Sequence, residues 1–382
     1  MNEPATMQII TARRGRTFYQ PRRAMFWVYL ILLVITFSTF GVRIIGQAIA
    51  MPGALLVGLI AQVILGYVLY RVIRWLDLFE KEPFTLLLAA FGWGAMIAPG
   101  LAVIANGDLS ELVTKLGGTS FASRWTAALA GPTSEEWLKT LGVIAIVVIG
   151  RAHIQRAMDG LIYGAVVGLG FQLMENMTYA FNYAQLDPSS DTSGAFLVTF
   201  TRFMVGIGSH AVYTGVTGFG LGWAVSRTDL PRARRIAMVA GCMLVAWGLH
   251  FLWNSQVLAD LGLAALLAKQ AFVIAFFIVV YRISARYEFD WFRYAICTEP
   301  PEVISPSEVE ELRTRRTRHQ AMKRIERLAG QEGARLQRQL QEEQLLLAVI
   351  RDESPNPDGD LSVADARRAV LDTRARLRER LL

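Results

Sequence analysis

The sequence predicts an all-α protein: a polytopic membrane helix bundle with about eight transmembrane helices, followed by a charged cytoplasmic helical tail. Three observations support this prediction. Hydrophobic residues make up 53% of the 382 residues and charged residues only 19%, against about 25% charged in an average soluble protein. The apolar residues concentrate between Phe26 and Tyr281, and the rest of the chain is markedly more polar. A single soluble domain is therefore excluded.

Eight apolar segments are long enough to cross a bilayer, whose hydrocarbon core of about 30 Å requires roughly 20 residues of helix. The first segment follows a basic stretch, as a signal peptide does. Its apolar part is longer than the roughly 7–15 residues of a signal sequence, so we expect it to be retained. The segments are 26–43, 52–71, 84–105, 125–150, 158–184, 195–225, 236–256 and 262–282.

The positive charges between these segments alternate from one side to the other. Seventeen Lys and Arg residues fall on the side of the N-terminus, and four fall on the opposite side, namely Arg43, Lys115, Arg124 and Lys269. Loops rich in Lys and Arg stay in the cytoplasm. We therefore expect an even number of spans, with both termini cytoplasmic.

The chain is expected to have three regions: a basic N-terminal segment 1–25, a transmembrane domain 26–283 and a charged helical tail 284–382. Residues 298–382 hold 16 Lys or Arg and 16 Asp or Glu, so the net charge of +7 arises before them. A tail without net charge argues against nucleic-acid binding. Its composition favours a helical hairpin or short coiled coil, which makes it a candidate for self-association.

The start of the tail also carries a helix signal. Pro300, Pro301 and Pro306 interrupt the chain after the last span. The sequence from Ser307 to Glu310 then has the pattern of a capping box. It predicts the beginning of a long polar helix.

Ionisable side chains inside a membrane span are costly and normally face the bundle interior. Glu135 lies about ten residues into the fourth span, or ~15 Å along the helix, and the others lie at similar depths. Four helices therefore bring two carboxylates and two imidazoles to the middle or outer half of one bundle. The embedded ionisable residues are Glu135, Glu136, Lys139, Glu175, Arg202, His210 and His250, with Asn176 and Asn254 as polar neighbours.

The spacing of these residues restricts how they pair. Lys139 follows Glu135 by four residues and Glu136 by three, so it can pair with either carboxylate on the helix surface. The glutamate that does not pair with Lys139 can then point toward the polar site inside the bundle. His250 and Asn254 are also four residues apart, which places the imidazole beside the amide.

Two chemistries fit two carboxylates and two imidazoles. In one, Glu175, His210 and His250 bind a divalent metal such as zinc, and a glutamate of the fourth span removes a proton from water. In the other no metal takes part: a glutamate activates water, and His250 with Asn254 stabilises the oxyanion. The residues alone do not separate these alternatives.

The ordered motifs resemble those of the PrsW-type intramembrane proteases, which are related to the type II CAAX prenyl proteases. The resemblance covers roughly residues 70 to 256, and the N-terminal segment and the tail lie outside it. The residues that carry it are Asp77, Glu80-Lys81-Glu82-Pro83, Glu135-Glu136-Trp137-Leu138-Lys139, Asp159-Gly160-Leu161-Ile162-Tyr163-Gly164, Gly168-Leu169-Gly170-Phe171, Glu175-Asn176, Arg202, His210 and His250 with Asn254.

This resemblance implies an intramembrane endopeptidase that cleaves a membrane-anchored protein, such as an anti-sigma factor. It implies that Glu135 or Glu136 activates water, that Glu175, His210 and His250 complete the site, and that Asn254 assists the oxyanion. Lys139, Asn176 and Arg202 would support them. The alternatives are a proton-coupled secondary transporter, since buried Glu, His and Lys also relay protons, and an inactive membrane scaffold.

Overall fold

The computed structural model describes residues 18–151, 153–188, 190–357 and 359–382. Within these ranges the chain is helical and contains no strand, which confirms the all-α prediction. The described residues divide into two compact units: one includes 18–77 and Glu82–Ser284, and the other includes Leu78–Lys81 and Ala285–Leu382. The expected N-terminal segment 1–25 lies, up to residue 17, outside the described residues.

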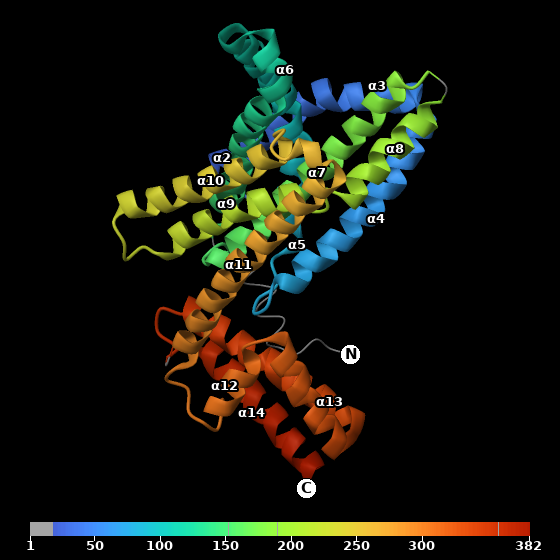
Figure 1. Cartoon of the computed structure of the whole chain (residues 1–382). Helices are drawn as coiled ribbons and strands as arrows, with labels where there is room; N and C mark the ends of the chain where they lie inside the picture. Colours follow the sequence, from blue (N-terminus) through green and yellow to red (C-terminus); the bar gives the residue numbers. More distant parts are fainter. Residues whose placement is uncertain (1–17, 152, 189, 358) are drawn as a thin grey trace. The chain divides into compact units, whose positions relative to one another are not determined.

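The first unit contains the apolar helices, and Figure 1 labels them in chain order. Short π-helical turns, η1 and η2, join α2 to α3 and α5 to α6. The elements are α2 (Ala24–Thr36), η1 (Phe37–Gly41), α3 (Val42–Ala50), α4 (Pro52–Leu76), α5 (Phe84–Gly92), η2 (Trp93–Ile97), α6 (Ala98–Ile149), α7 (Ala157–Leu186), α8 (Asp191–Met204), α9 (Ser209–Ser226), α10 (Arg232–Asn254), η3 (Ala259–Leu261) and the start of α11 (Leu263–Ile296).

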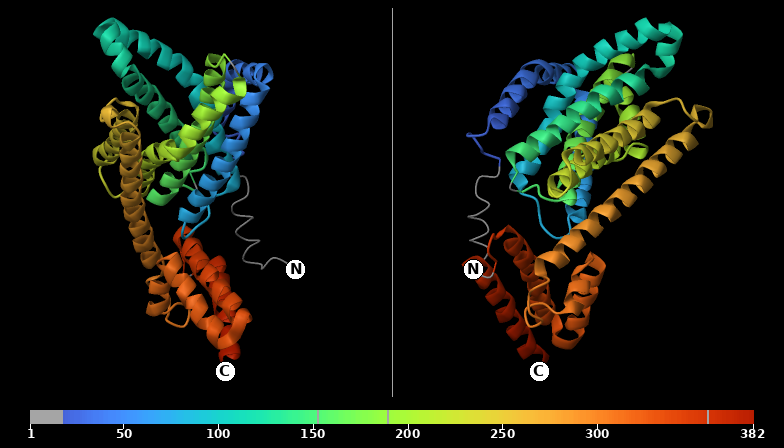
Figure 2. Two further views of the ribbon diagram at one scale, coloured as in Figure 1. Left: turned by 45° about the vertical axis from the view of Figure 1, so that its right-hand side comes forward. Right: turned by 90° about the vertical axis from the view of Figure 1, so that its left-hand side faces the viewer.

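By length and composition, six helices of the described chain are suited to cross a membrane, and the bent pair α8 and α9 adds a seventh. One of the six, Phe84–Ile149, has 66 residues. It is a hairpin rather than one rod: at Gly118 the backbone leaves the helix with φ 77°, and the amide of Asn106 donates to Glu135, 29 residues away. A straight helix would separate these residues by ~43 Å. Figure 2 shows the turn, and counting its two arms separately gives the eight spans expected from the sequence.

The most extensive helix contact in this unit joins α7 and α9. Glycines allow their backbones to approach closely, because a Cβ atom on Gly164 would lie 2.3 Å from the carbonyl oxygen of Thr214. On Gly168 it would lie 2.1 Å from the carbonyl oxygen of His210. Small residues at four-residue spacing allow this packing in membranes, where hydrophobic burial no longer drives helices together.

Gly164→Ala is therefore expected to destabilise the protein by about 1–3 kcal/mol, because the added methyl group must push α7 and α9 apart. The matched control is Gly241→Ala in α10, where a Cβ atom meets nothing within 4 Å and alanine favours the helix by up to about 1 kcal/mol. Thermal unfolding in detergent measures both variants. Equal melting temperatures would contradict the role of Gly164.

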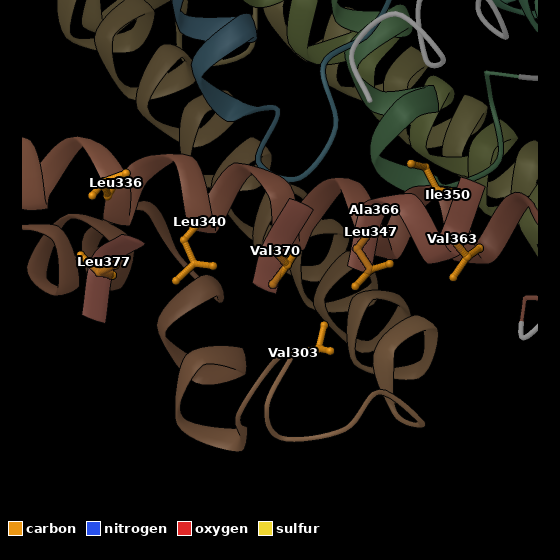
Figure 3. Packing of buried hydrophobic residues seen from close by; sticks show 9 residues of the cluster. All are labelled: Val303, Leu336, Leu340, Leu347, Ile350, Val363, Ala366, Val370 and Leu377. Atoms are coloured by element: carbon orange, nitrogen blue, oxygen red, sulfur yellow. The ribbon is translucent and has the colours of Figure 1, made fainter. Parts of the chain in front are cut away.

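The second unit is a small helical bundle of α12 (Pro306–Leu312), α13 (Arg315–Glu353) and α14 (Leu361–Leu381) with the end of α11. Like α6, α13 turns back at a glycine: Gly330 has φ 68°, and Gln341 donates to the carbonyl of Arg318, 23 residues earlier. Figure 3 shows the apolar side chains that pack at its centre. They are Val303, Leu336, Leu340, Leu347, Ile350, Val363, Ala366, Val370 and Leu377.

The predicted helix start in this unit is wrong by two residues. Ser305, rather than Ser307, forms the capping box, since its backbone N–H donates to Glu308 at 2.8 Å and its hydroxyl accepts from the Glu308 N–H. Pro306 then occupies the first helical position, which its fixed φ favours. The helix that begins there is the short α12, and the long helix begins at Arg315 after the capping residue Thr314.

Candidate active site

Five helices bring the embedded polar residues of the sequence together in the first unit. The second arm of α6 supplies two glutamates and a lysine, and α7, α8, α9 and α10 supply the remainder. Hydrogen bonds or ion pairs connect all of them into one cluster. The residues are Glu135, Glu136, Lys139, Glu175, Asn176, Arg202, His210, His250 and Asn254.

Lys139 lies at the centre of this cluster and is fully buried. Its Nζ is 2.5 Å from Glu136 Oε1 and 3.9 Å from Glu135 Oε2, so both predicted pairings occur, with Glu136 closer. The ammonium also lies 3.0 Å from His210 Nδ1 and 4.5 Å from the centre of the Phe171 ring. One cation thus offsets the charge of two buried carboxylates.

The hydrogen bonds determine which nitrogen of each imidazole carries a proton. An ammonium only donates, so His210 Nδ1 accepts from Lys139, and Nε2–H donates to Glu175 at 3.1 Å. In His250 the order is reversed: Nδ1–H donates to Glu136 Oε1 at 2.8 Å, and Nε2 faces the amide of Asn254 at 3.3 Å. The ring of His250 also stacks on Tyr213, with centroids 5.0 Å apart.

Glu135 is held less tightly than Glu136, although each of them has an Oε2 that is buried without a hydrogen-bond partner. Glu135 Oε1 accepts from the amide of Asn106 at 3.3 Å. Glu135 Oε2 lies 3.9 Å from His250 Nε2. Asn106, in turn, accepts from the hydroxyl of Ser134. Glu136, by contrast, binds Lys139 and His250 through Oε1.

Sequence reasoning missed Asn106. It lies one residue beyond the expected third span, 84–105, and was therefore not counted as an embedded group. An asparagine beside an apolar segment was the available signal. The structure extends the helix past it and folds the second arm of α6 back against it.

Glu175 belongs to a second part of the cluster. Its carboxylate accepts from Arg202 and from His210, and Arg202 Nε donates to Asn176 Oδ1 at 2.5 Å. The guanidinium also lies over the ring of Tyr179, 4.2 Å from its centre. Arg202 therefore offsets the charge of Glu175, as Lys139 does for the other two carboxylates.

Arg202 and His210 do not share one continuous span, contrary to the predicted segment 195–225. The helix is broken between Met204 and Ser209, and its two parts differ in direction by 46°. Gly208 adopts φ 72°, a conformation that favours glycine. The amides of Gln172 and Gln270 donate to the carbonyls of Gly206 and Ile207, which lie in this break, at 2.7 and 2.9 Å.

The cluster includes a set of groups suited to a metal ion. One ligand atom from each of Glu135, His210 and His250 lies within 4.8 Å of the others. Two imidazoles and a carboxylate are typical zinc ligands, and the unpartnered Glu135 Oε2 fits that role. Binding through His210 requires the loss of one of its two hydrogen bonds. The set differs from the expected Glu175, His210 and His250, because Arg202 engages Glu175.

The fold and site define a polytopic helical membrane protein with a buried site of glutamates and histidines. A family model described as "PrsW family intramembrane metalloprotease" matches residues 82–282, which is more than half of the chain. The protein belongs to this family.

Curated relatives give weaker, partial matches. "Protease PrsW" of Bacillus subtilis (strain 168) is 28% identical over 42% of this chain and 66% of its own length. "Protease PrsW" of Clostridioides difficile (strain 630) is 27% identical over 38% of this chain and 57% of its own length. The chain thus spans less than two thirds of each relative. No solved structure gives a significant match.

Proposed function

We propose that the protein is an intramembrane endopeptidase that hydrolyses a peptide bond in a membrane-anchored protein by glutamate-activated water. The main support is Glu135, whose carboxylate lies beside two imidazoles. Its buried Oε2 has no hydrogen-bond partner, and the carboxylate lacks the close bonds to Lys139 and His250 that hold Glu136. A free carboxylate oxygen in a dry site is suited to accept a proton. Family membership gives independent support.

In this proposal Glu135 Oε2 takes a proton from water while the water oxygen attacks the carbonyl carbon of the substrate. His250 Nε2 lies 3.9 Å from Glu135 Oε2 and accepts from the amide of Asn254. In the transition state the Asn254 N–H would turn from His250 to the oxyanion and stabilise it. When the C–N bond breaks, Glu135 returns the proton to the leaving amine. Glu136 and Lys139 hold His250 and His210 in orientation, and Arg202 and Asn176 hold Glu175.

The same residues fit a divalent metal. A zinc ion held by Glu135, His210 and His250 would supply a Lewis acid that lowers the pKa of a bound water. With Glu135 as a ligand, the proton acceptor would be Glu136, whose Oε2 is also buried without a hydrogen-bond partner. We expect the purified protein to contain about one zinc per chain and to lose it in His250→Ala, as measured by elemental mass spectrometry. Trp247→Phe, one helical turn away, serves as the control. Full activity in metal-free protein would contradict metal assistance.

We further propose that the protein resides in a bacterial plasma membrane with both termini in the cytoplasm. The unequal distribution of Lys and Arg between the two sides supports the orientation, and the bacterial origin of the relatives supports the choice of membrane. The proposed substrate is a single-span protein, such as an anti-sigma factor, cleaved near the outer side of the bilayer. The tail remains a candidate for self-association.

Purified protein in liposomes with a panel of single-span reporters tests the activity. The reporters carry transmembrane segments of anti-sigma factors, and mass spectrometry identifies the products. We expect cleavage by the native protein and none by His250→Ala or Glu136→Ala. Cleavage by the double variant would refute the proposal. Solute uptake without cleavage would assign a transporter, and the absence of both activities would assign a scaffold.

A further inference from the structure

A cavity of about 470 Å³ lies between α4, α5 and α7, away from the histidines. Its floor is apolar and buried, and includes Leu87 and Leu169. Its rim includes Leu59, Val63 and Leu88, each at least half exposed. In a membrane these rim residues face lipid, so the cavity is open to a molecule that arrives from within the bilayer.

One buried polar side chain, Gln62, lines this apolar cavity. Only 7% of Gln62 is exposed, and its Oε1 accepts from Asn176 at 2.9 Å. Among the described residues no group accepts a hydrogen bond from its Nε2. The cavity therefore contains a buried amide with donor capacity left over.

The depth of Gln62 indicates what can satisfy this donor. It lies ten residues from the start of α4 and fourteen from its end, or ~15 Å and ~21 Å along the helix at 1.5 Å per residue. The surrounding lipid supplies no water at that depth, and an unsatisfied polar group is costly there. A lipid acyl chain offers no acceptor. A polypeptide does, through a polar side chain or a carbonyl freed by a break in its helix.

Gln62 is also connected to the proposed site. Asn176 donates to Gln62 and accepts from Arg202, which donates to Glu175, and Glu175 accepts from His210. These bonds form an unbroken chain from the cavity to the active-site imidazole. A molecule bound at Gln62 thus contacts the same network that holds the site together.

We propose that this cavity is a recognition site for the transmembrane segment of the substrate. Apolar side chains of that segment fill the cavity, and an acceptor near its middle binds the amide of Gln62. Segments with a polar residue or a helix break at mid-membrane are therefore preferred over uniformly apolar segments. This inference rests on the proposed protease function, which the cleavage assay tests separately.

Photocrosslinking of the full chain in liposomes tests the proposal without cleavage. The background is Glu135→Gln, and Val63 is replaced by benzoylphenylalanine. Two synthetic leucine-rich peptides of about 20 residues are compared, one with asparagine at its centre and one with leucine there. We expect roughly three- to tenfold more crosslinking of the asparagine peptide, the range that single hydrogen bonds between membrane helices support.

Two variants test whether Gln62 and the cavity cause the difference in crosslinking between the two peptides. Gln62→Met removes the donor and should make the two peptides equivalent. Because it also removes the bond to Asn176, Leu59→Phe provides a second variant, which fills the cavity and should reduce crosslinking of both peptides. The control is Ile60→Phe, 54% exposed and outside the cavity lining.

Equal crosslinking of both peptides in the parent protein, or no effect of Leu59→Phe, would overturn the proposal. So would a phospholipid that copurifies with the protein and is displaced by Leu59→Phe, as detected by native mass spectrometry, since the cavity would then be a lipid site. Crosslinking as expected together with no cleavage in the native background would leave the recognition site standing and remove the proposed activity.

Discussion

Glu135→Gln is expected to lower the rate of peptide cleavage by ~10²–10⁴-fold, the range typical of general acid–base catalysis. The amide keeps the shape of the side chain and an oxygen for Asn106, but it cannot take a proton from water. Because Oε2 has no hydrogen-bond partner among the described residues, its replacement leaves few other interactions to lose. The fold should therefore survive, and single-turnover cleavage in liposomes gives the rate.

The control for this variant is Glu111→Gln in the first arm of α6, where the carboxylate is 65% exposed and pairs only with Lys115 among the described residues. It should cleave at the native rate. Glu136→Gln should instead lower both activity and stability, since Glu136 binds Lys139 and His250. If Glu135→Gln retained native activity while Glu136→Gln lost it at unchanged stability, the assignment of the two glutamates would be reversed.

Lys139→Met is expected to destabilise the protein by about 3–5 kcal/mol, the cost of breaking a buried ion pair by removing one partner. The fully buried ammonium contacts Glu136, Glu135 and His210. Methionine fills a similar volume, so the loss reports charge rather than packing. Without this cation two buried carboxylates lose their shared positive partner. Unfolding in detergent, followed by tryptophan fluorescence, measures the change.

Lys115→Met provides the matched comparison. Lys115 also pairs with a glutamate four residues away, at 2.6 Å, but its side chain is 68% exposed. Exposed ion pairs contribute about 0–1 kcal/mol, so this variant should unfold close to the native temperature. A similar loss of stability in both variants would show that Lys139 does not balance a buried charge.

Much of this arrangement could be predicted from the sequence, because the bilayer sets strict requirements. A helix must be long and apolar to span it, and this located the spans. An ionisable residue is costly within it, and this located the residues that the structure gathers into one cluster. The close packing at Gly164 and Gly168 depends on the same environment, since only small side chains permit it.

What escaped prediction depends on tertiary contacts. Hydropathy does not indicate that 195–225 is broken near Gly208, because the break is stabilised by the amides of Gln172 and Gln270 from other helices. Spacing along α6 allowed Lys139 two partners. Only the tertiary structure shows that Glu136 is held by Lys139 and His250, whereas Glu135 accepts from the amide of Asn106. The sequence predicts a connection between the spans 84–105 and 125–150, but it does not indicate that the turn at Gly118 brings Asn106 to Glu135.

The break between α8 and α9 has an electrostatic consequence. The C-terminal end of α8 and the N-terminal end of α9 meet there, with Arg202 in the last turn of one and His210 in the first turn of the other. Helix ends carry about half a unit charge, negative at the C-terminus and positive at the N-terminus. The negative end therefore favours the guanidinium, and the positive end favours an anion beside His210. Negative charge that develops during hydrolysis would meet a field fixed by the backbone, with no side chain required to move.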